Sequence, residues 1–248
     1  METRSVKSKP FKNSCRSATA FFLAFCAIFL FSCGEQSDSQ APGPSPGKSE
    51  GFTFFELTAE SRLTSELRKD LEKKLGSDAI TRKSPLDLEI APRTFLQEHF
   101  PEIHALNRRL NYSPRERIEH NVTKLMYRYP GKKQVPFSFV ELIFSNYSGK
   151  PLVFHTSAKQ EGATVIQTLE EKYGKPRVSQ WDEGRQRALY WRKEGELMVV
   201  YALRDRFGNP EYQVQLLFLD ALEELLRTEE KEREAREREK KEAVRDAF

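Results

Sequence analysis

The feature of this sequence that most constrains its fold is a series of six short strand-like segments between residues 122 and 219. The segments are 122–129, 137–144, 152–156, 187–193, 196–204 and 211–219. Turn-prone residues separate consecutive segments, and a helix-like stretch at 161–173 divides the series in half. Because short turns join antiparallel neighbours, we predict an α+β fold. It would be an antiparallel sheet of about six strands, two three-strand meanders linked by a helix, with helices on one face.

Helical periodicity precedes the first strands. Leu63, Leu67, Leu71 and Leu75 recur every four residues, and Gly76 stands where a helix-terminating glycine is common. Pro101 divides the apolar pattern of 93–110 and suits the first position of a second helix. A capping-box spacing at 113–116 predicts a short helix beginning at residue 114. We therefore expect one globular domain at 51–219, compatible with two α-βββ halves.

The last segment, 220–248, is predicted to be a charged C-terminal helix. Residues 227–248 hold eight basic and eight acidic side chains. Four pairs have the favourable i,i+4 order with glutamate first: Glu229/Arg233, Glu232/Arg236, Glu234/Arg238 and Glu237/Lys241. Leu222, Leu225 and Leu226 can pack on the body, but no apolar stripe continues beyond them, so we expect the rest of the helix to lie in solvent.

The N-terminal segment has the pattern of an export signal. A basic and polar segment, residues 1–17, precedes Ala18–Phe31, a run of 14 residues that is apolar apart from Thr19. This run is shorter than the roughly 20 residues of a membrane span. The following Leu30-Phe31-Ser32-Cys33 resembles the lipobox of bacterial lipoprotein precursors. The resemblance implies a signal peptide at 1–32, cleavage between Ser32 and Cys33, and diacylglycerol attachment to the Cys33 thiol.

The residues after Cys33 extend this interpretation. Gly34, rather than aspartate, implies sorting to the outer membrane, on its periplasmic face, if the source is Gram-negative. Residues 34–50 contain three Pro, three Gly, four Ser and no large apolar side chain, so 33–50 is predicted to be a lipidated cysteine followed by a flexible tether. We therefore expect an exported protein anchored to the bacterial cell envelope, contacting the membrane through acyl chains on Cys33.

Cysteine usage and charge exclude several classes of protein. The three cysteines, Cys15, Cys26 and Cys33, all lie in the first 33 residues, so the body can form no internal disulfide. The net charge of +4 comes from residues 1–32, because 33–248 hold 36 basic and 36 acidic side chains. A net charge of zero gives no support to nucleic-acid binding.

No strong catalytic, nucleotide or metal motif occurs in the chain. The four histidines are His99, His104, His120 and His155. Their spacing does not define a metal site with Asp87 or Glu98, so we predict no catalytic, cofactor or metal residues. Trp181, Tyr190, Trp191 and Tyr201 could form an aromatic recognition face, but sheet packing is the favoured interpretation. Arg185, Arg187, Arg192, Lys193, Arg204 and Arg206 are interleaved with acidic residues, which favours a mixed surface over a basic binding edge.

Residues 161–219 show a further resemblance, carried by Tyr173-Gly174-Lys175-Pro176, Trp181 and the strands after them. This order is similar to small outer-membrane assembly lipoproteins of the BamE-like type. The sequence as a whole favours a non-catalytic, lipid-anchored envelope protein that binds an envelope protein partner through a sheet edge or the charged helix. The alternative is a periplasm-facing enzyme or small-ligand-binding protein whose site assembles from distant residues.

Overall fold

The computed structural model describes residues 51–90, 94–112, 118–128, 130–159, 161–181, 186–204 and 207–248. The described helices are α1 (Ser65–Leu75), α2 (Phe95–His99), α3 (Pro101–Leu110), the 3₁₀ turn η1 (Pro130–Lys133), α4 (Gly162–Tyr173) and α5 (Leu219–Ala247). The described strands are β1 (Ala79–Ser84), β2 (His120–Tyr127), β3 (Phe139–Ser145), β4 (Pro151–Ala158), β5 (Arg177–Trp181), β6 (Gln186–Lys193), β7 (Glu196–Arg204) and β8 (Pro210–Phe218).

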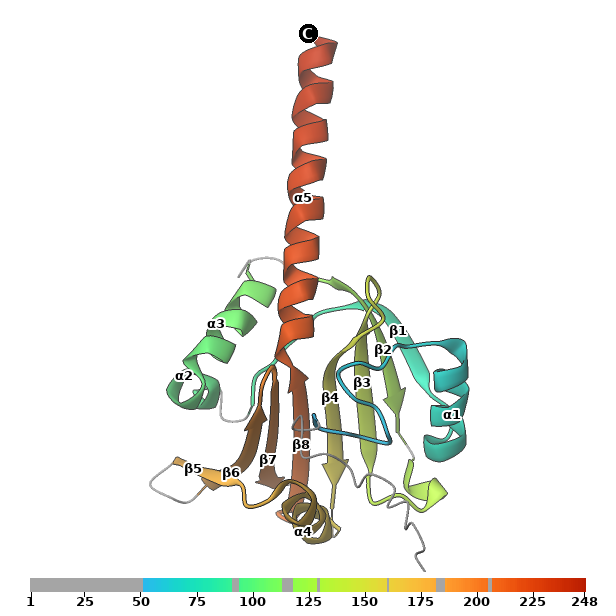
Figure 1. Cartoon of the computed structure of the whole chain (residues 1–248), viewed down its shortest axis with the longest axis vertical. Coiled ribbons are helices and arrows are strands. Elements are labelled where there is room, and N and C mark those ends of the chain that lie inside the picture. The colour runs from blue at the N-terminus through green and yellow to red at the C-terminus, as the bar shows by residue number, and fades with distance from the viewer. Residues whose placement is uncertain are drawn as a thin grey trace, which may run out of the picture. The chain divides into compact units, whose positions relative to one another are not determined.

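All eight strands form one antiparallel sheet in the order β1-β2-β3-β4-β8-β7-β6-β5 (Figure 1). Each half of the body therefore contributes a meander of four strands, and the two meanders meet where β4 pairs with β8. The α+β class and the antiparallel sheet are confirmed, whereas the expected number of six strands is too low. The two missed strands, β1 and β5, are the two edges of the sheet.

Helices cover both faces of the sheet rather than one, as two adjacent residues of β6 demonstrate. Trp191 donates its indole N–H to the carbonyl oxygen of Gly174 at the end of α4, 2.8 Å away. Tyr190 instead packs edge-on against Phe100, between α2 and α3, with ring centroids 5.0 Å apart. Because successive side chains of a strand point to opposite faces, α4 and α3 lie on opposite sides of the sheet. The prediction of helices on one face is wrong.

Aromatic packing fills the face beneath α4. The Phe154 ring of β4 lies between Phe144 and Phe218, with centroid distances of 5.6 and 5.1 Å. Phe52 is fully buried and meets Tyr173 of α4 edge-on at 5.1 Å. The backbone N–H of Phe52 donates to the Glu196 carboxylate of β7 at 2.7 Å, so the chain joins the core from its first described residues.

The predicted helix boundaries agree with local chemistry. Thr64 caps α1 by accepting the Leu67 backbone N–H at 3.1 Å, and Gly76 ends that helix with φ of 93°. Pro101 occupies the start of α3, as its lack of an N–H favours. Residues 113–117, where the sequence predicts the start of a short helix, lie outside the described residues.

The two edge strands differ in how open they are to further pairing. The register of β1 shifts between Arg82 and Ser84, and Lys83 between them has φ of 59°, an uncommon value for a residue with a side chain. Such a bulge interrupts an edge and discourages added strands. β5 has continuous register with β6, and the Val178 side chain on it is 53% exposed.

Candidate functional site at the root of the C-terminal helix

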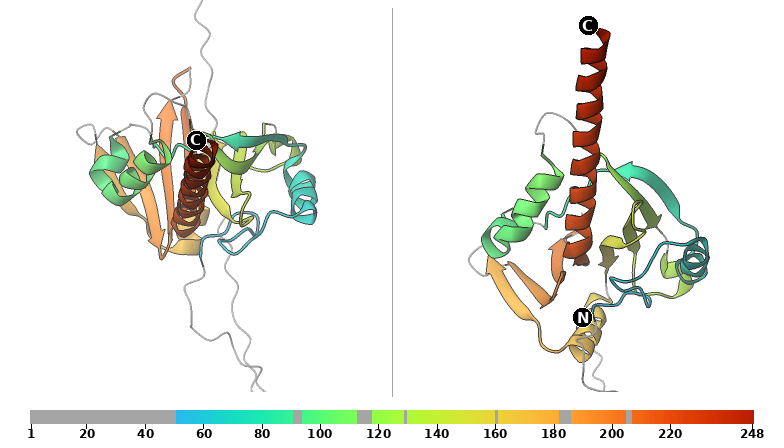
Figure 2. Two further views of the ribbon diagram at one scale, coloured as in Figure 1. Left: turned by 90° about the horizontal axis from the view of Figure 1, so that it is seen from above. Right: turned by 45° about the horizontal axis from the view of Figure 1, so that its top comes forward.

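Helix α5 begins at Leu219, immediately after the last residue of β8. Four apolar residues of its first two turns, Ala221, Leu222, Leu225 and Leu226, are buried, as the leucine pattern predicts. From Lys231 onward the side chains are exposed apart from half-buried Ala235. At 1.5 Å per residue the 29 residues extend about 44 Å, and Figures 1 and 2 show the later turns standing clear of the sheet.

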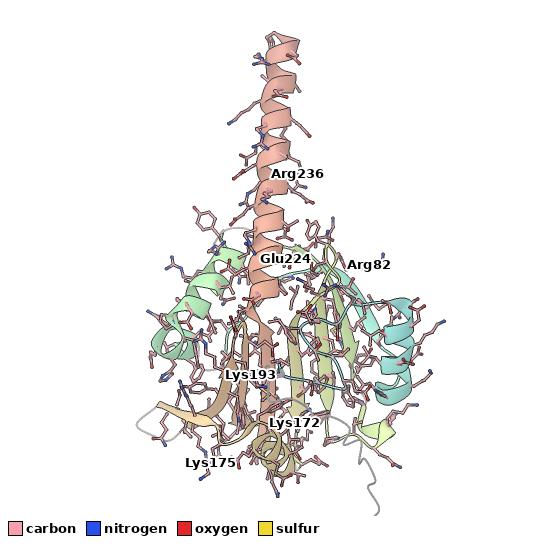
Figure 3. All side chains as sticks on the ribbon, viewed as in Figure 1. Arg82, Lys172, Lys175, Lys193, Glu224 and Arg236 are labelled. Carbon is pink, nitrogen blue, oxygen red and sulfur yellow. The ribbon has the colours of Figure 1, made fainter. Side chains whose placement is uncertain are left out.

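Polar contacts from two directions surround the first turns of α5. Arg109 of α3 donates to the Glu223 carboxylate at 2.9 Å. Lys150, just before β4, contacts Glu224 at 2.8 Å. Figure 3 labels Glu224 near the start of α5. The Tyr147 hydroxyl, in the turn between β3 and β4, donates to Glu232 at 2.9 Å, and burial together with Glu232 raises the pKa of that tyrosine. These contacts fix where α5 leaves the body.

We call residues 219–232 of α5, together with the body residues that they contact, the root of the helix. At its centre His120 and Glu229 form a hydrogen-bonded pair. His120 of β2 is 2% exposed, and its Nδ1 lies 2.7 Å from the Glu229 carboxylate. Its Nε2 lies 3.0 Å from the carbonyl oxygen of Leu110, and the other Glu229 oxygen accepts the Asn121 backbone N–H at 2.8 Å. Both ring nitrogens face oxygen acceptors. A neutral imidazole has one N–H and donates to only one of these two acceptors.

Two clefts flank α5 at this level and share Ile118, Glu229 and Arg233. The first has a volume of about 350 Å³ and is also lined by Lys83, Asn121, Tyr147, Glu232 and Arg236. The second measures about 250 Å³ and adds Arg109, Tyr112, Leu226 and Glu230. Each cleft mixes cations, carboxylates and an aromatic ring, which suits a polar macromolecular surface with both signs of charge.

Two glutamates of α5 contact the body of the protein instead of the arginines of their own helix that the sequence predicts as partners. Glu229 and Glu232 contact His120 and Tyr147 of the body rather than Arg233 and Arg236 of their own helix. Of the four expected pairs, Glu234–Arg238 is an ion pair, at 4.0 Å. No local signal marks Glu229 or Glu232 as body-facing, because their partners lie 109 and 85 residues away in the chain.

The other three histidines lie away from this root. His99 and His104 belong to α2 and α3, and each has one buried ring nitrogen without a hydrogen-bond partner among the described residues. His155 of β4 lies 2.8 Å from the Gln213 side-chain oxygen, and burial lowers the pKa of His155. Within the described ranges no three His, Cys, Asp or Glu side chains are placed to hold a metal ion.

For the aromatic residues the sequence favours sheet packing, and for the basic residues a mixed surface; the described members Trp191, Tyr190, Tyr201 and Arg192 agree with this. Trp191 and Tyr190 lie on opposite faces, and burial raises the pKa of Tyr201 to about 12. Arg192 contacts Glu102 of α3, as expected for a mixed surface. Arg185, Arg206 and the side chain of Trp181 lie outside the described part of the chain, as do the lipobox residues Leu30, Ser32 and Cys33.

Among the helices that the structure describes, none combines the length and apolar character needed to cross a membrane. Comparisons with protein-family models, with curated proteins and with solved structures each find no match to this chain.

Proposed function

We infer that this chain is a lipid-anchored protein of the bacterial envelope that acts by binding another protein, with α5 as its principal contact element. One observation carries the proposal. A helix of 29 residues is fastened to the body by its first turns and by Glu229 and Glu232, and then presents an exposed, alternately charged surface. A helix that contributes nothing to the core beyond Leu226 has no structural reason to continue for nearly six further turns.

The proposed anchor supports this role. Acylation at Cys33 followed by a 17-residue tether confines the body near a membrane, on the periplasmic face of the outer membrane in a Gram-negative cell. The tether spans at most about 56 Å, so α5 can meet partners embedded in or attached to the same membrane. Confinement raises the effective concentration of such partners, and contacts made mainly by charged side chains then suffice. The resemblance to BamE-like assembly lipoproteins is consistent with such a binding role.

The first test concerns the anchor. Cells that express the protein are labelled with an alkyne analogue of palmitate, and the label on the protein is detected after purification. Wild type and Cys26→Ala are expected to carry label, whereas Cys33→Ala is expected to carry none and to remain unprocessed. Equal labelling of wild type and Cys33→Ala would exclude lipidation at this residue.

The second test concerns α5. A photo-crosslinking amino acid replaces Arg238 or Val244 on the exposed turns, with Lys69 on α1 and Val178 on the β5 edge as controls. All four side chains are exposed. The α5 positions are expected to yield one discrete crosslinked protein that the Lys69 position does not yield. A product obtained from Val178 alone would move the contact to the sheet edge, and equal products from all four positions would reject a specific surface.

The alternative of a catalytic or small-ligand site at the root of α5 makes a different prediction. If Glu229, His120 and Tyr147 formed a reaction centre, replacing any of them would abolish function even with residues 234–248 intact. If α5 is the contact element, a chain that ends at Arg233 keeps the root and loses partner binding. Complementation of a deletion strain by these two kinds of variant separates the two functions.

A further inference from the structure

The larger of the two clefts beside α5 is bordered by that helix, the end of β1 and the turn between β3 and β4. Its volume of about 350 Å³ lies within the usual range of small-ligand sites, roughly 300–1,000 Å³. Three cations line it, Lys83, Arg233 and Arg236. Their side chains are exposed, and none of them has a hydrogen-bond or ion-pair partner among the described residues. Figure 3 shows Arg236 on the part of α5 just above the body.

Two carboxylates of this cleft are bound by the body instead of by the arginines. One Glu229 oxygen lies 2.7 Å from His120, and the other accepts the Asn121 backbone N–H at 2.8 Å. Glu232 accepts the Tyr147 hydroxyl at 2.9 Å. These glutamates are the i,i+4 partners that the sequence predicts for the two arginines of the cleft. Because the body takes both glutamates, the guanidinium groups keep their N–H donors for a ligand.

The backbone of the third cation, Lys83, is independent support for a binding role. Its φ is 59°, at the point where the register between β1 and β2 shifts. This left-handed conformation is uncommon for a residue with a long side chain, whereas glycine adopts it freely. Such backbone strain is found most often at functional sites. Here the strained residue contributes an ammonium group to the cleft that Arg233 and Arg236 also line.

We propose that this cleft binds a phosphate monoester, held by the Lys83 ammonium and by the guanidinium groups of Arg233 and Arg236. A guanidinium donates two parallel N–H bonds to phosphate oxygens. A monoester offers three such oxygens and a charge close to −2 at neutral pH. This charge suits three unpaired cations that share the cleft with one unpaired carboxylate, Glu119. A carboxylate or a phosphodiester carries a single negative charge and offers only two free oxygens.

The site goes beyond the proposed partner contact of α5 and does not rest on it. Neither Arg238 nor Val244, which stand for that contact in the crosslinking test, lines the cleft. The phosphate monoester can belong to a lipid headgroup or to a soluble molecule, and the three cations bind the same group in both cases. The experiment therefore tests the phosphate first and its source second.

The experiment uses the chain from Gly34, which keeps the tether and a core that extends from Phe52 to Leu226. The probe is phenyl phosphate, measured by titration calorimetry at low ionic strength. Saturable one-to-one binding is expected for wild type, with weaker binding of phenyl sulfate, a monoanion. Arg236→Gln is expected to weaken phenyl phosphate binding roughly threefold to tenfold. Arg238→Gln removes the same charge outside the cleft, where Arg238 pairs with Glu234, and is expected to bind as wild type does.

A second variant separates binding from folding. Lys83→Gly removes the ammonium group and suits a φ of 59°, so it is expected to weaken binding by a similar factor without lowering the midpoint of urea unfolding. Unchanged binding by Lys83→Gly would contradict the assignment of this residue to the site.

Vesicles distinguish the two sources of the phosphate. Sedimentation is measured with vesicles that contain phosphatidic acid, a monoester, or an equal share of phosphatidylglycerol, a diester. Binding to phosphatidic acid that Arg236→Gln weakens would assign a lipid headgroup, and binding of phenyl phosphate alone would assign a soluble ester. Three results would overturn the proposal: no binding of either monoester by wild type, equal losses in Arg236→Gln and Arg238→Gln, or equal affinities for phenyl phosphate and phenyl sulfate.

Discussion

Leu222→Ala is expected to lower the free energy of unfolding by about 2–5 kcal/mol, as for other fully buried leucines. Leu222 is 0% exposed and lies where α5 leaves β8, so its removal opens a cavity at the joint between helix and sheet. Urea denaturation monitored by circular dichroism measures the change, and the slope of the transition should stay constant because the same surface unfolds.

The matched control for this prediction is a chain that ends at Arg233. The removed residues, 234–248, are exposed apart from half-buried Ala235, and their ion pair, Glu234–Arg238, is internal to the helix. Deletion is therefore expected to leave the midpoint of the body's unfolding nearly unchanged. A loss as large as that of Leu222→Ala would mean that the end of α5 packs as part of the fold.

Glu229→Ala is expected to lower the free energy of unfolding by about 1–3 kcal/mol, because it leaves a buried ring nitrogen of His120 without its hydrogen-bond partner. The same change also removes the acceptor of the Asn121 backbone N–H. Hydrogen exchange should show faster opening of the first turns of α5, since Glu229 joins that helix to β2. Glu237→Ala, on the exposed part of the same helix, is the control and is expected to change stability by less than about 0.5 kcal/mol.

A double-mutant cycle identifies the partner of Glu229. In a His120→Asn background, Glu229→Ala is expected to cost much less than in wild type, because neighbouring residues in one network are not additive. Equal costs in the two backgrounds would show that Glu229 stabilises the protein through Asn121 or through solvent, and that His120 does not contribute.

The sequence predicts a helix or strand correctly where the apolar residues of that one element repeat with its own period. The leucines of α1, Pro101 at the start of α3 and the six inner strands all have apolar periodicity that local reasoning detects. β1 and β5 were missed because an edge strand has one neighbour and much solvent. Five of the six β1 residues are exposed, so AITRKS has no apolar alternation to detect.

Other features depend on contacts that no local pattern encodes. The apolar face of each helix is visible in the sequence. The face of the sheet that a helix covers is not, because it depends on the path of the chain between helix and strand. In this fold it becomes apparent from the contacts of Tyr190 with Phe100 and of Trp191 with Gly174. The same holds for the root of α5. Glu229 looks like a solvent-exposed member of an i,i+4 pair until His120, 109 residues earlier, lies beside it.

The sheet order has a consequence for how the chain reaches its native state. Within each meander, consecutive strands pair across short turns and can form early, but β4 must wait for β8, which follows it by more than 50 residues. Until then β4, seven of whose eight residues are buried in the native body, is an open apolar edge. Because β8 is also the last strand, the half-folded chain is the form most exposed to aggregation, and chaperones are expected to act at this stage.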